Sequence, residues 1–391
     1  MKKKRKICIV VNSRANYARI KSVLYHAKKS KKIELQIVIG ASALLDRYGD
    51  LNRILRKDGF KVNQISYTIV EGSETSTMAK SVGLGIIELT NVFKNLKPDI
   101  VLTIADRFEN LAVAIASSYL NICLAHTQGG ETTGSIDESV RHAITKLAHI
   151  HFPATQRSKN YLIKMGENPK KIFNVGCPSM DIINFKQLSK KNLNINKYGV
   201  GYNIKNNEPY IVVLFHPNTT EVLNTKEQIN VLIRSISEFS KENNSQVLWF
   251  WPNIDAGSDK ISSQLRKFRE TNLDQKIRFI VNLEPEEYLK LIYNSKVIVG
   301  NSSSGIREAS FMGIPSVNIG TRQINREKYI NVRDCDFNIK AIKKEILFQF
   351  KRKKYKKSTL YGTGNAGKKI IDILTKVDLS IKKELNYLKN H

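Results

Sequence analysis

Short apolar runs alternate with helical patterns along the whole chain. Residues 7–11 form the first apolar run, and residues 17–27 after it carry apolar side chains at helical spacing. Strands that alternate with helices fold into parallel sheets covered by helices. The expected strands are 7–11, 35–39, 100–104, 122–125, 151–152, 211–215, 247–251, 277–281 and 297–299, and the expected helices are 17–27, 78–96, 111–119, 136–148, 227–239, 262–268, 286–293 and 306–312.

A polar stretch divides this alternation into two cycles, and 391 residues suffice for two domains with separate cores. We expect an α/β fold of two doubly wound, Rossmann-like domains that face a cleft, where ligands meet the carboxyl ends of the strands. The amphipathic segments 368–374 and 381–388 predict C-terminal helices that return to the first domain. The expected boundaries are 1–186 for the first domain, 187–208 for a linker, 209–358 for the second domain and 359–391 for the C-terminal helices.

The segment 300–306, with the sequence GNSSSGI, lies between an apolar strand pattern and a helix pattern. A glycine and serine turn of this kind directs backbone N–H groups and hydroxyls towards the positive end of a helix dipole, where a phosphate fits. Glu308, just inside the helix, could hold the hydroxyls of a ribose. We therefore expect the C-terminal half to bind a nucleotide.

Polar side chains follow several expected strands at the edge that would face the cleft. Asp106 could move a proton and Arg107 could bind phosphate, although these two residues taken alone slightly favour a structural ion pair at a strand end. Two glycines precede Glu131, and Asp137 follows in the first turn of a helix, where capping is an alternative role. Crowded carboxylates raise one another's pKa and suit proton transfer at neutral pH. His216 ends the first strand of the second cycle and could bind phosphate.

Composition narrows the possible partners. The net charge of +29 indicates either nucleic-acid binding or lysine-rich solvated surfaces, and the second is favoured because the excess is spread along the chain without a nucleic-acid motif. No apolar stretch is long enough to span a membrane or to serve as a signal-peptide core, which favours a cytoplasmic protein. The histidines and four cysteines lack metal-ligand spacing, and no dinucleotide glycine fingerprint follows the first strand. We expect no metal and no redox cofactor.

In their order and spacing these motifs resemble the hydrolysing UDP-N-acetylglucosamine 2-epimerases of sialic-acid synthesis. The resemblance covers essentially the whole chain and rests on residues 13–15, 106–108, 129–131, 134–137, 139–149, 176–179, 216–217, 252–258, 300–303 and 320–323. It implies a fold like that of the two-domain (GT-B) glycosyltransferases and a reaction without cofactors. A base removes the proton on sugar carbon 2, the nucleoside diphosphate leaves carbon 1, and water adds with inversion at carbon 2.

The resemblance also implies roles for individual residues. Asp106 and Asp137 match acids tied to proton transfer, and Leu283 lies where the backbone of the family meets the base. Nucleotide-binding positions are matched by Arg14, Arg107, His216, Asn253, Ser302, Ser303, Glu308 and Arg322. The expected catalytic set is Asp106, Gln128, Glu131, Asp137 and His216.

One departure bears on the substrate. Sialic-acid enzymes usually carry Glu, implicated in the chemistry, where this chain has Gln128, so either Glu131 or Asp137 takes over its work or the substrate differs. We expect UDP-N-acetylglucosamine to be converted to N-acetylmannosamine and UDP. The alternative is UDP- or GDP-linked 2,4-diacetamido-2,4,6-trideoxyglucose, the substrate of the legionaminic-acid branch, which the residues around Gln128 resemble more. Ser262 and Ser263 interrupt the basic pattern that serves feedback inhibition in animal relatives, so we expect no such feedback.

Two rival functions stay open at this point. A glycosyltransferase of the same architecture would keep the nucleotide site but would not need acids at Asp106, Glu131 and Asp137 together. A nucleic-acid-binding protein would account for the charge and would show salt-sensitive binding. The expected partner is a nucleotide sugar, with neither nucleic acid nor membrane, and the resemblance implies at least a dimer (a homodimer or tetramer).

Overall fold

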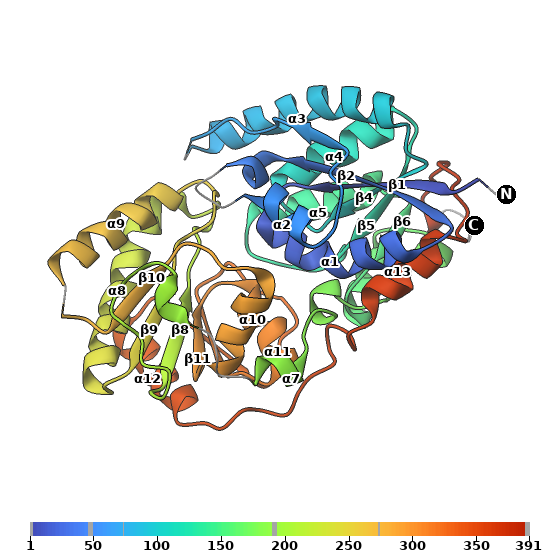
Figure 1. Ribbon diagram of the computed structural model, residues 1–391. Coiled ribbons are helices and arrows are strands. Elements are labelled where there is room, and N and C mark those ends of the chain that lie inside the picture. Colours follow the sequence, from blue (N-terminus) through green and yellow to red (C-terminus); the bar gives the residue numbers. More distant parts are fainter. Residues whose placement is uncertain (1–2, 46–49, 73, 190–193, 273, 388–391) are drawn as a thin grey trace.

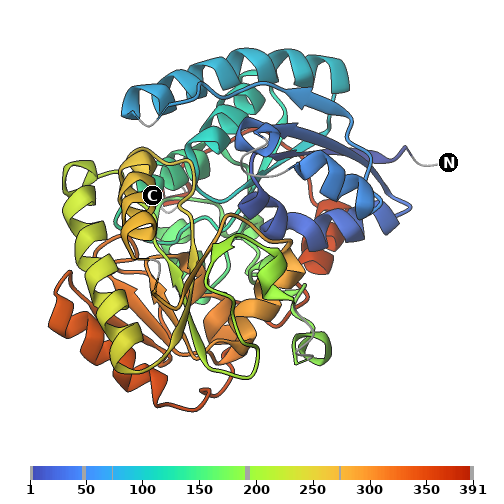
Figure 2. The same cartoon turned by 60° about the vertical axis from the view of Figure 1, so that its left-hand side comes forward.

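The computed structural model describes residues 3–45, 50–72, 74–189, 194–272 and 274–387. It contains two α/β lobes, each built on one twisted sheet between helices (Figures 1 and 2). The expected doubly wound α/β class is confirmed. Part of the expected linker, residues 190–193, lies outside the described residues. None of the helices in the described ranges is long and apolar enough to cross a membrane.

The first lobe is built on a six-stranded parallel sheet in the order β3-β2-β1-β4-β5-β6. The two central strands, RKICIVV and IVLTI, are mostly apolar, as expected where helices cover both faces of a sheet. The strand order reverses between β1 and β4, where ligands bind in open sheets of this kind. The strands are β1 (Arg5–Val11), β2 (Ile33–Gly40), β3 (Gln64–Ser66), β4 (Ile100–Ile104), β5 (Cys123–Thr127) and β6 (Ile150–Phe152).

Two groups of helices sandwich this sheet. The first two helices and the last helix of the chain pack on one face, and α3, α4 and α5 pack on the other. Helix α6 follows β6, the last strand of this sheet in chain order. The helices are α1 (Arg14–Lys29), α2 (Leu51–Lys57), α3 (Thr75–Leu96), α4 (Phe108–Tyr119), α5 (Ile136–Leu147), α6 (Gln156–Lys164) and the C-terminal α13 (Ala366–Leu374).

The second lobe is built on a seven-stranded sheet in the order β13-β12-β11-β8-β9-β10-β7, parallel except that β7 pairs antiparallel with β10. Its helices again divide between the two faces. The strands are β7 (Val200–Gly201), β8 (Tyr210–Leu214), β9 (Gln246–Phe250), β10 (Ile277–Ile280), β11 (Val297–Gly300), β12 (Ser316–Ile319) and β13 (Val332–Cys335). The helices are α7 (Phe185–Leu188), α8 (Thr225–Glu242), α9 (Ser258–Thr271), α10 (Pro285–Asn294), α11 (Glu308–Met312) and α12 (Ile339–Phe350).

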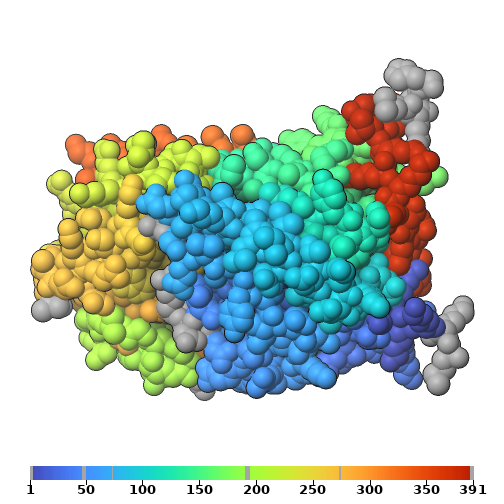
Figure 3. Space-filling model, turned by 90° about the horizontal axis from the view of Figure 1, so that it is seen from above, coloured from blue at the N-terminus to red at the C-terminus, as the bar shows by residue number. Residues whose placement is uncertain are grey.

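The C-terminal segment returns to the first lobe, as its amphipathic pattern predicts. Helix α13 packs on α1 so closely that a Cβ on Gly367 would lie 1.9 Å from Ser22 Oγ. The second expected helix is not formed over residues 381–385. Lys383 there donates instead to the backbone carbonyl of Thr145 (3.0 Å) at the end of α5 and pairs with Glu167 (2.5 Å). Figure 3 shows this segment (red) on the first lobe, away from the yellow helices of the second.

Candidate active site

A cavity of about 290 Å³ lies between the lobes, where the carboxyl ends of strands from both sheets meet. Side chains that follow β1, β4, β8, β9 and β11 line it, as the positions of the polar residues predict. Gln128 and Glu131 are the two predicted site residues that do not line it. The lining includes Arg14, Asp106, Arg107, Asp137, His216, Asn253, Leu283, Ser302, Ser303, Glu308 and Arg322.

The turn after β11 forms one wall of the cavity. Gly300 has a φ of +129°, and a Cβ there would lie 2.1 Å from the carbonyl oxygen of Leu214, so only glycine fits. The next residue, Asn301, exchanges two 2.8 Å hydrogen bonds with the backbone of His216. Ser302 and Ser303 are thereby held beside the loop that follows β8. Helix α11 begins at Glu308 rather than at residue 306, because a 3-10 turn, Ser303–Gly305, intervenes.

His216 is a neutral hydrogen-bond donor in this cavity. Its Nδ1 accepts the backbone N–H of Asn253 at 3.3 Å, which leaves the proton on Nε2. Burial lowers the pKa of His216 to about 3, and the charge of Arg322 acts in the same direction. The imidazole can therefore offer an N–H to a phosphate oxygen but adds no charge.

Glu308 lines the same cavity and has an unsatisfied acceptor. Its side chain is buried, and its Oε2 has no hydrogen-bond partner in the described part of the chain. A buried carboxylate oxygen without a donor is unfavourable unless a ligand supplies one. On the opposite side, Arg14 crosses between the lobes and donates to the carbonyl of Leu283 at 3.0 Å.

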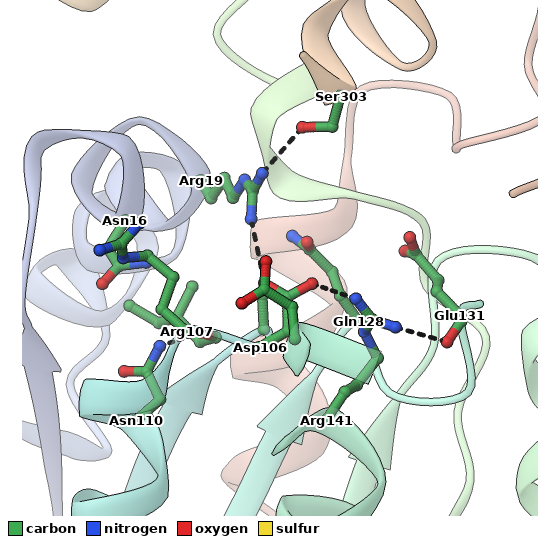
Figure 4. Close-up of polar contacts among 12 residues, drawn as sticks. Asn16, Arg19, Asp106, Arg107, Asn110, Gln128, Glu131, Arg141 and Ser303 are labelled. Atoms are coloured by element: carbon green, nitrogen blue, oxygen red, sulfur yellow. Dashed lines mark hydrogen bonds and ion pairs between the residues drawn. The ribbon is translucent and has the colours of Figure 1, made fainter. Parts of the chain in front are cut away.

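Asp106 is held in its ionised form by arginines (Figure 4). Arg141 donates to its Oδ2, and the guanidinium groups of Arg19 and Arg326 each lie 3.9 Å from a carboxylate oxygen. Burial favours protonation, but these cations outweigh it and hold the pKa of Asp106 well below its usual range. Arg19 also donates to Ser303 at 3.0 Å, which ties this carboxylate to the turn of the second lobe.

Asp137 has the opposite electrostatic environment. It lies in the first turn of α5 but does not cap the helix, whose N-cap is Ser135. Burial, together with the charges of Asp106 and Asp255, raises the pKa of Asp137 to about 6, although Arg322 lies 3.7 Å away. The cavity therefore has one carboxylate fixed in the charged state and one that titrates near neutral pH, a pairing suited to proton transfer.

Gln128 and Glu131 lie behind the cavity wall and share one arginine. Arg307 donates to Gln128 Oε1 through one nitrogen and pairs with Glu131 Oε2 at 2.5 Å through another. Burial would raise the pKa of Glu131, but Arg307 and Arg326 lower it. Glu131 is therefore an ionised partner of arginine. Gln128 adopts φ +62°, a conformation that is uncommon for a residue with a side chain.

Several residues of this network were not singled out from the sequence. Arg107 is flanked by Asp255 (2.8 Å) and by Glu109 (3.2 Å), and both carboxylates are buried. Arg307 and Arg326 contribute further buried cations, and Arg19 contributes a partly exposed one. Motif spacing carries no signal for them, because their partners come from distant parts of the chain. The one available hint is that Arg307 directly follows the serine turn.

Comparisons with known proteins identify relatives along nearly the full length. A family model described as UDP-N-acetylglucosamine 2-epimerase matches residues 26–375. A hydrolysing UDP-N,N'-diacetylbacillosamine 2-epimerase of Legionella pneumophila is 34% identical over 96% of this chain and 97% of its own length. A hydrolysing GDP/UDP-N,N'-diacetylbacillosamine 2-epimerase of Campylobacter jejuni is 32% identical, covering 86% of this chain and 85% of its own. In structure, the Methanocaldococcus jannaschii UDP-GlcNAc 2-epimerase in complex with UDP-GlcNAc and UDP aligns with a TM-score of 0.79 at 20% identity, over 95% of this chain and 99% of that one.

Proposed function

The chain belongs to the UDP-N-acetylglucosamine 2-epimerase family, and from this premise we propose that it converts a UDP-linked 2-acetamido sugar into UDP and a free sugar inverted at carbon 2. It is an enzyme, a hydrolysing nucleotide-sugar 2-epimerase with a GT-B-like fold, so the resemblance drawn from its motifs is confirmed. One observation carries the assignment of the site. A single cavity brings Asp106 and Asp137 of the first lobe to Ser302, Ser303 and Glu308 of the second.

The second lobe binds the nucleotide in this proposal. The free Oε2 of Glu308 accepts a hydrogen bond from a ribose hydroxyl. The hydroxyls of Ser302 and Ser303 and the Nε2–H of His216 donate to the diphosphate, and Arg322 adds positive charge. Donors fixed before the reaction stabilise the charge that develops on the leaving diphosphate, because they need not reorganise during bond cleavage.

The first lobe performs the proton transfer. Asp137 accepts the proton on sugar carbon 2 as the bond from carbon 1 to the diphosphate oxygen breaks. The electron pair of that bond leaves with UDP, and a double bond forms between carbons 1 and 2. The fixed negative charge of Asp106 stabilises the positive charge that develops on the sugar. Water then adds across this double bond: its hydroxyl goes to carbon 1, and its proton, relayed through solvent, goes to the face of carbon 2 opposite Asp137, which inverts that carbon. Asp137 releases to solvent the proton that it took up.

Gln128 and Glu131 have a positioning role in this scheme. Gln128 cannot exchange a proton, and Glu131 is engaged with Arg307 outside the cavity lining. Together they orient Arg307, which is buried at the boundary between the lobes. Of the two substitutes considered for the missing Glu, Asp137 is favoured because it lines the cavity and titrates near neutral pH.

Two sugars fit the proposal, and they differ at carbons 4 and 6. UDP-N-acetylglucosamine is the expected substrate, and the Methanocaldococcus enzyme, solved with that ligand, shares the fold. The 2,4-diacetamido-2,4,6-trideoxy sugar is the second candidate. It is supported by Gln128 and by the names of the Legionella and Campylobacter relatives.

Incubation with each nucleotide sugar in deuterated water tests the function. We expect UDP and a free mannose-type sugar with one deuterium at carbon 2, and the ratio of kcat/KM for the two substrates identifies the preferred one. Asp106→Asn should abolish turnover and retain UDP binding, because no nucleotide-contacting group is removed. Nucleotide sugars that stay intact until an acceptor is added would instead indicate a glycosyltransferase.

Assembly into a homodimer or tetramer, which the family resemblance implies, is part of the proposal. Tyr119 and Ile87, on neighbouring helices α4 and α3, are 85% and 63% exposed and provide apolar surface for such contacts. Light scattering of the purified chain measures the assembly directly, and a monomer at micromolar concentration would contradict it.

A further inference from the structure

Arg326 is a buried cation of the cavity wall whose side chain donates no hydrogen bond to the described residues. It lies between β12 and β13, lines the cavity, and its side chain is 3% exposed. Its Nη2 lies 3.4 Å from Glu131 Oε2 and 3.9 Å from Asp106 Oδ2, and its Nε has no partner among the described residues. A buried guanidinium with unused donors is unfavourable, so a cavity it faces is suited to a ligand that accepts hydrogen bonds.

The two neighbouring carboxylates are already engaged by other arginines. Glu131 Oε2 pairs with Arg307 at 2.5 Å, and Asp106 Oδ2 accepts a hydrogen bond from Arg141. Burial, and to a lesser degree the charge of the adjacent Arg307, lowers the pKa of Arg326 to about 10. The Nε–H of Arg326 therefore has no competing acceptor among the described residues and can donate to a substrate.

The charges around Arg326 favour a neutral acceptor over a phosphate. A phosphate oxygen on Arg326 would lie close to both Asp106 and Glu131, which are ionised, and like charges at such distances repel. A carbonyl oxygen has no net charge and accepts from a guanidinium without this penalty. Arg322, beside the more readily protonated Asp137, is the better partner for the diphosphate.

We propose that Arg326 donates a hydrogen bond to the carbonyl oxygen of the acetamido group on sugar carbon 2 and so selects acylamino sugars over sugars that carry a hydroxyl there. The assignment rests on the proposed function, which places Asp106 beside the reacting carbons. Because Arg326 lies 3.9 Å from Asp106, a substituent of carbon 2 is the part of the sugar within its reach. Arg326 then recognises a feature shared by both candidate substrates.

Calorimetry with UDP, UDP-N-acetylglucosamine and UDP-glucose tests the assignment, because the two sugars differ only at carbon 2. The measurements use an Asp137→Asn background to prevent turnover. We expect the Asp137→Asn protein to bind UDP-N-acetylglucosamine about 10- to 100-fold more tightly than UDP-glucose, which is the range for a hydrogen bond to a charged group. Arg326→Met should remove the preference and leave UDP affinity within about twofold. Arg322→Met is the matched control, in which UDP affinity falls and the preference is kept.

Three results would overturn the assignment. The first is an Arg326→Met variant that still prefers UDP-N-acetylglucosamine over UDP-glucose to the same degree. The second is a loss of UDP affinity in that variant as large as its loss of affinity for the acetamido sugar. The third is an Asp137→Asn protein that binds UDP but does not prefer either sugar. If Arg326→Met does not fold, Arg326→Lys keeps the charge beside Glu131 and Asp106 but loses the planar donor pair, and a reduced preference is again expected. Failure of the proposed function is distinct from all of these, since the unmutated protein would then bind no UDP or release no free sugar.

Discussion

Gly134 of the first lobe lies directly against the backbone of the second, and replacing it with alanine tests whether the lobes must meet for catalysis. An ideal Cβ there would lie 2.1 Å from the carbonyl oxygen of Thr321, whereas real Cβ atoms essentially never come within 3.0 Å of such an atom. The backbones must therefore separate by at least 0.9 Å, the difference between these distances. Because the φ of Gly134 lies outside the left-handed region, alanine adds no backbone strain and acts only through this contact.

The separation falls between the two halves of the site. The N–H of Gly134 donates to the carbonyl of Arg322 (3.2 Å), its carbonyl accepts from Asn218 Nδ2 (3.1 Å), and Asp137 follows three residues later. A displacement of about 1 Å between reacting groups lowers rates by about 100-fold. That factor corresponds to about 2.7 kcal/mol of transition-state stabilisation.

Initial-rate measurements of UDP release give kcat/KM for Gly134→Ala, and thermal unfolding reports on the integrity of each lobe. We expect the rate to fall by about 100-fold while the melting temperature stays close to that of the parent protein, because both cores are untouched. Gly83→Ala in α3 is the matched control, since an added Cβ there meets nothing within 4 Å. A Gly134→Ala protein with kcat/KM within about twofold of the control would refute the reasoning.

Three further predictions concern buried charges. First, kcat/KM should rise with pH through about 6 as Asp137 ionises. Because the pKa of Asp137 is raised from 3.8 to about 6 on folding, the folded protein loses stability as the pH increases through this range and the buried carboxyl becomes charged. Asp137→Asn removes that charge and should raise the melting temperature more at pH 8 than at pH 5. A pH profile without this limb would exclude Asp137 as the base. Second, Glu308→Gln should weaken UDP binding by about 10-fold in calorimetry and leave 2′,3′-dideoxy-UDP binding unchanged; equal losses for both ligands would place Glu308 away from the ribose. Third, Arg307→Met removes the buried ion pair between Arg307 and Glu131. This change should lower the free energy of unfolding, measured in urea, by about 3–5 kcal/mol. The half-exposed Arg157, changed to Met, should lower it by less than about 1 kcal/mol, and a similar loss in both variants would contradict a special role for Arg307.

The elements that periodicity predicts are those with a continuous apolar core face. The strands at 7–11 and 100–104 and the helix at 78–96 all match the structure, because their burial depends on local pattern. Helix α2, with seven residues, is too short to establish a period, and strand β13 is polar and partly exposed. Both were missed for these reasons.

The site was predictable only where it follows from topology. Parallel strands bring their carboxyl ends to one edge, so polar residues after those strands could be placed in one cleft. The arginine partners of these residues could not be predicted in this way, because Arg307 and Gln128 are 179 residues apart in the sequence and Arg19 and Ser303 are 284 apart. Such pairs depend on how two separately folded lobes face each other. The ionisation states of Asp106, Asp137 and Glu131 depend on these pairs and were equally inaccessible.

Because α13 completes the packing around α1, the first lobe is made from two separate stretches of the gene. A fragment that stops before residue 366 would remove Ile370 and Leu374 from the apolar core that they share with Val23 and Ala27 of α1. Chimaeras between relatives must therefore exchange the N-terminal stretch and the C-terminal helix together. The polypeptide therefore crosses between the lobes twice.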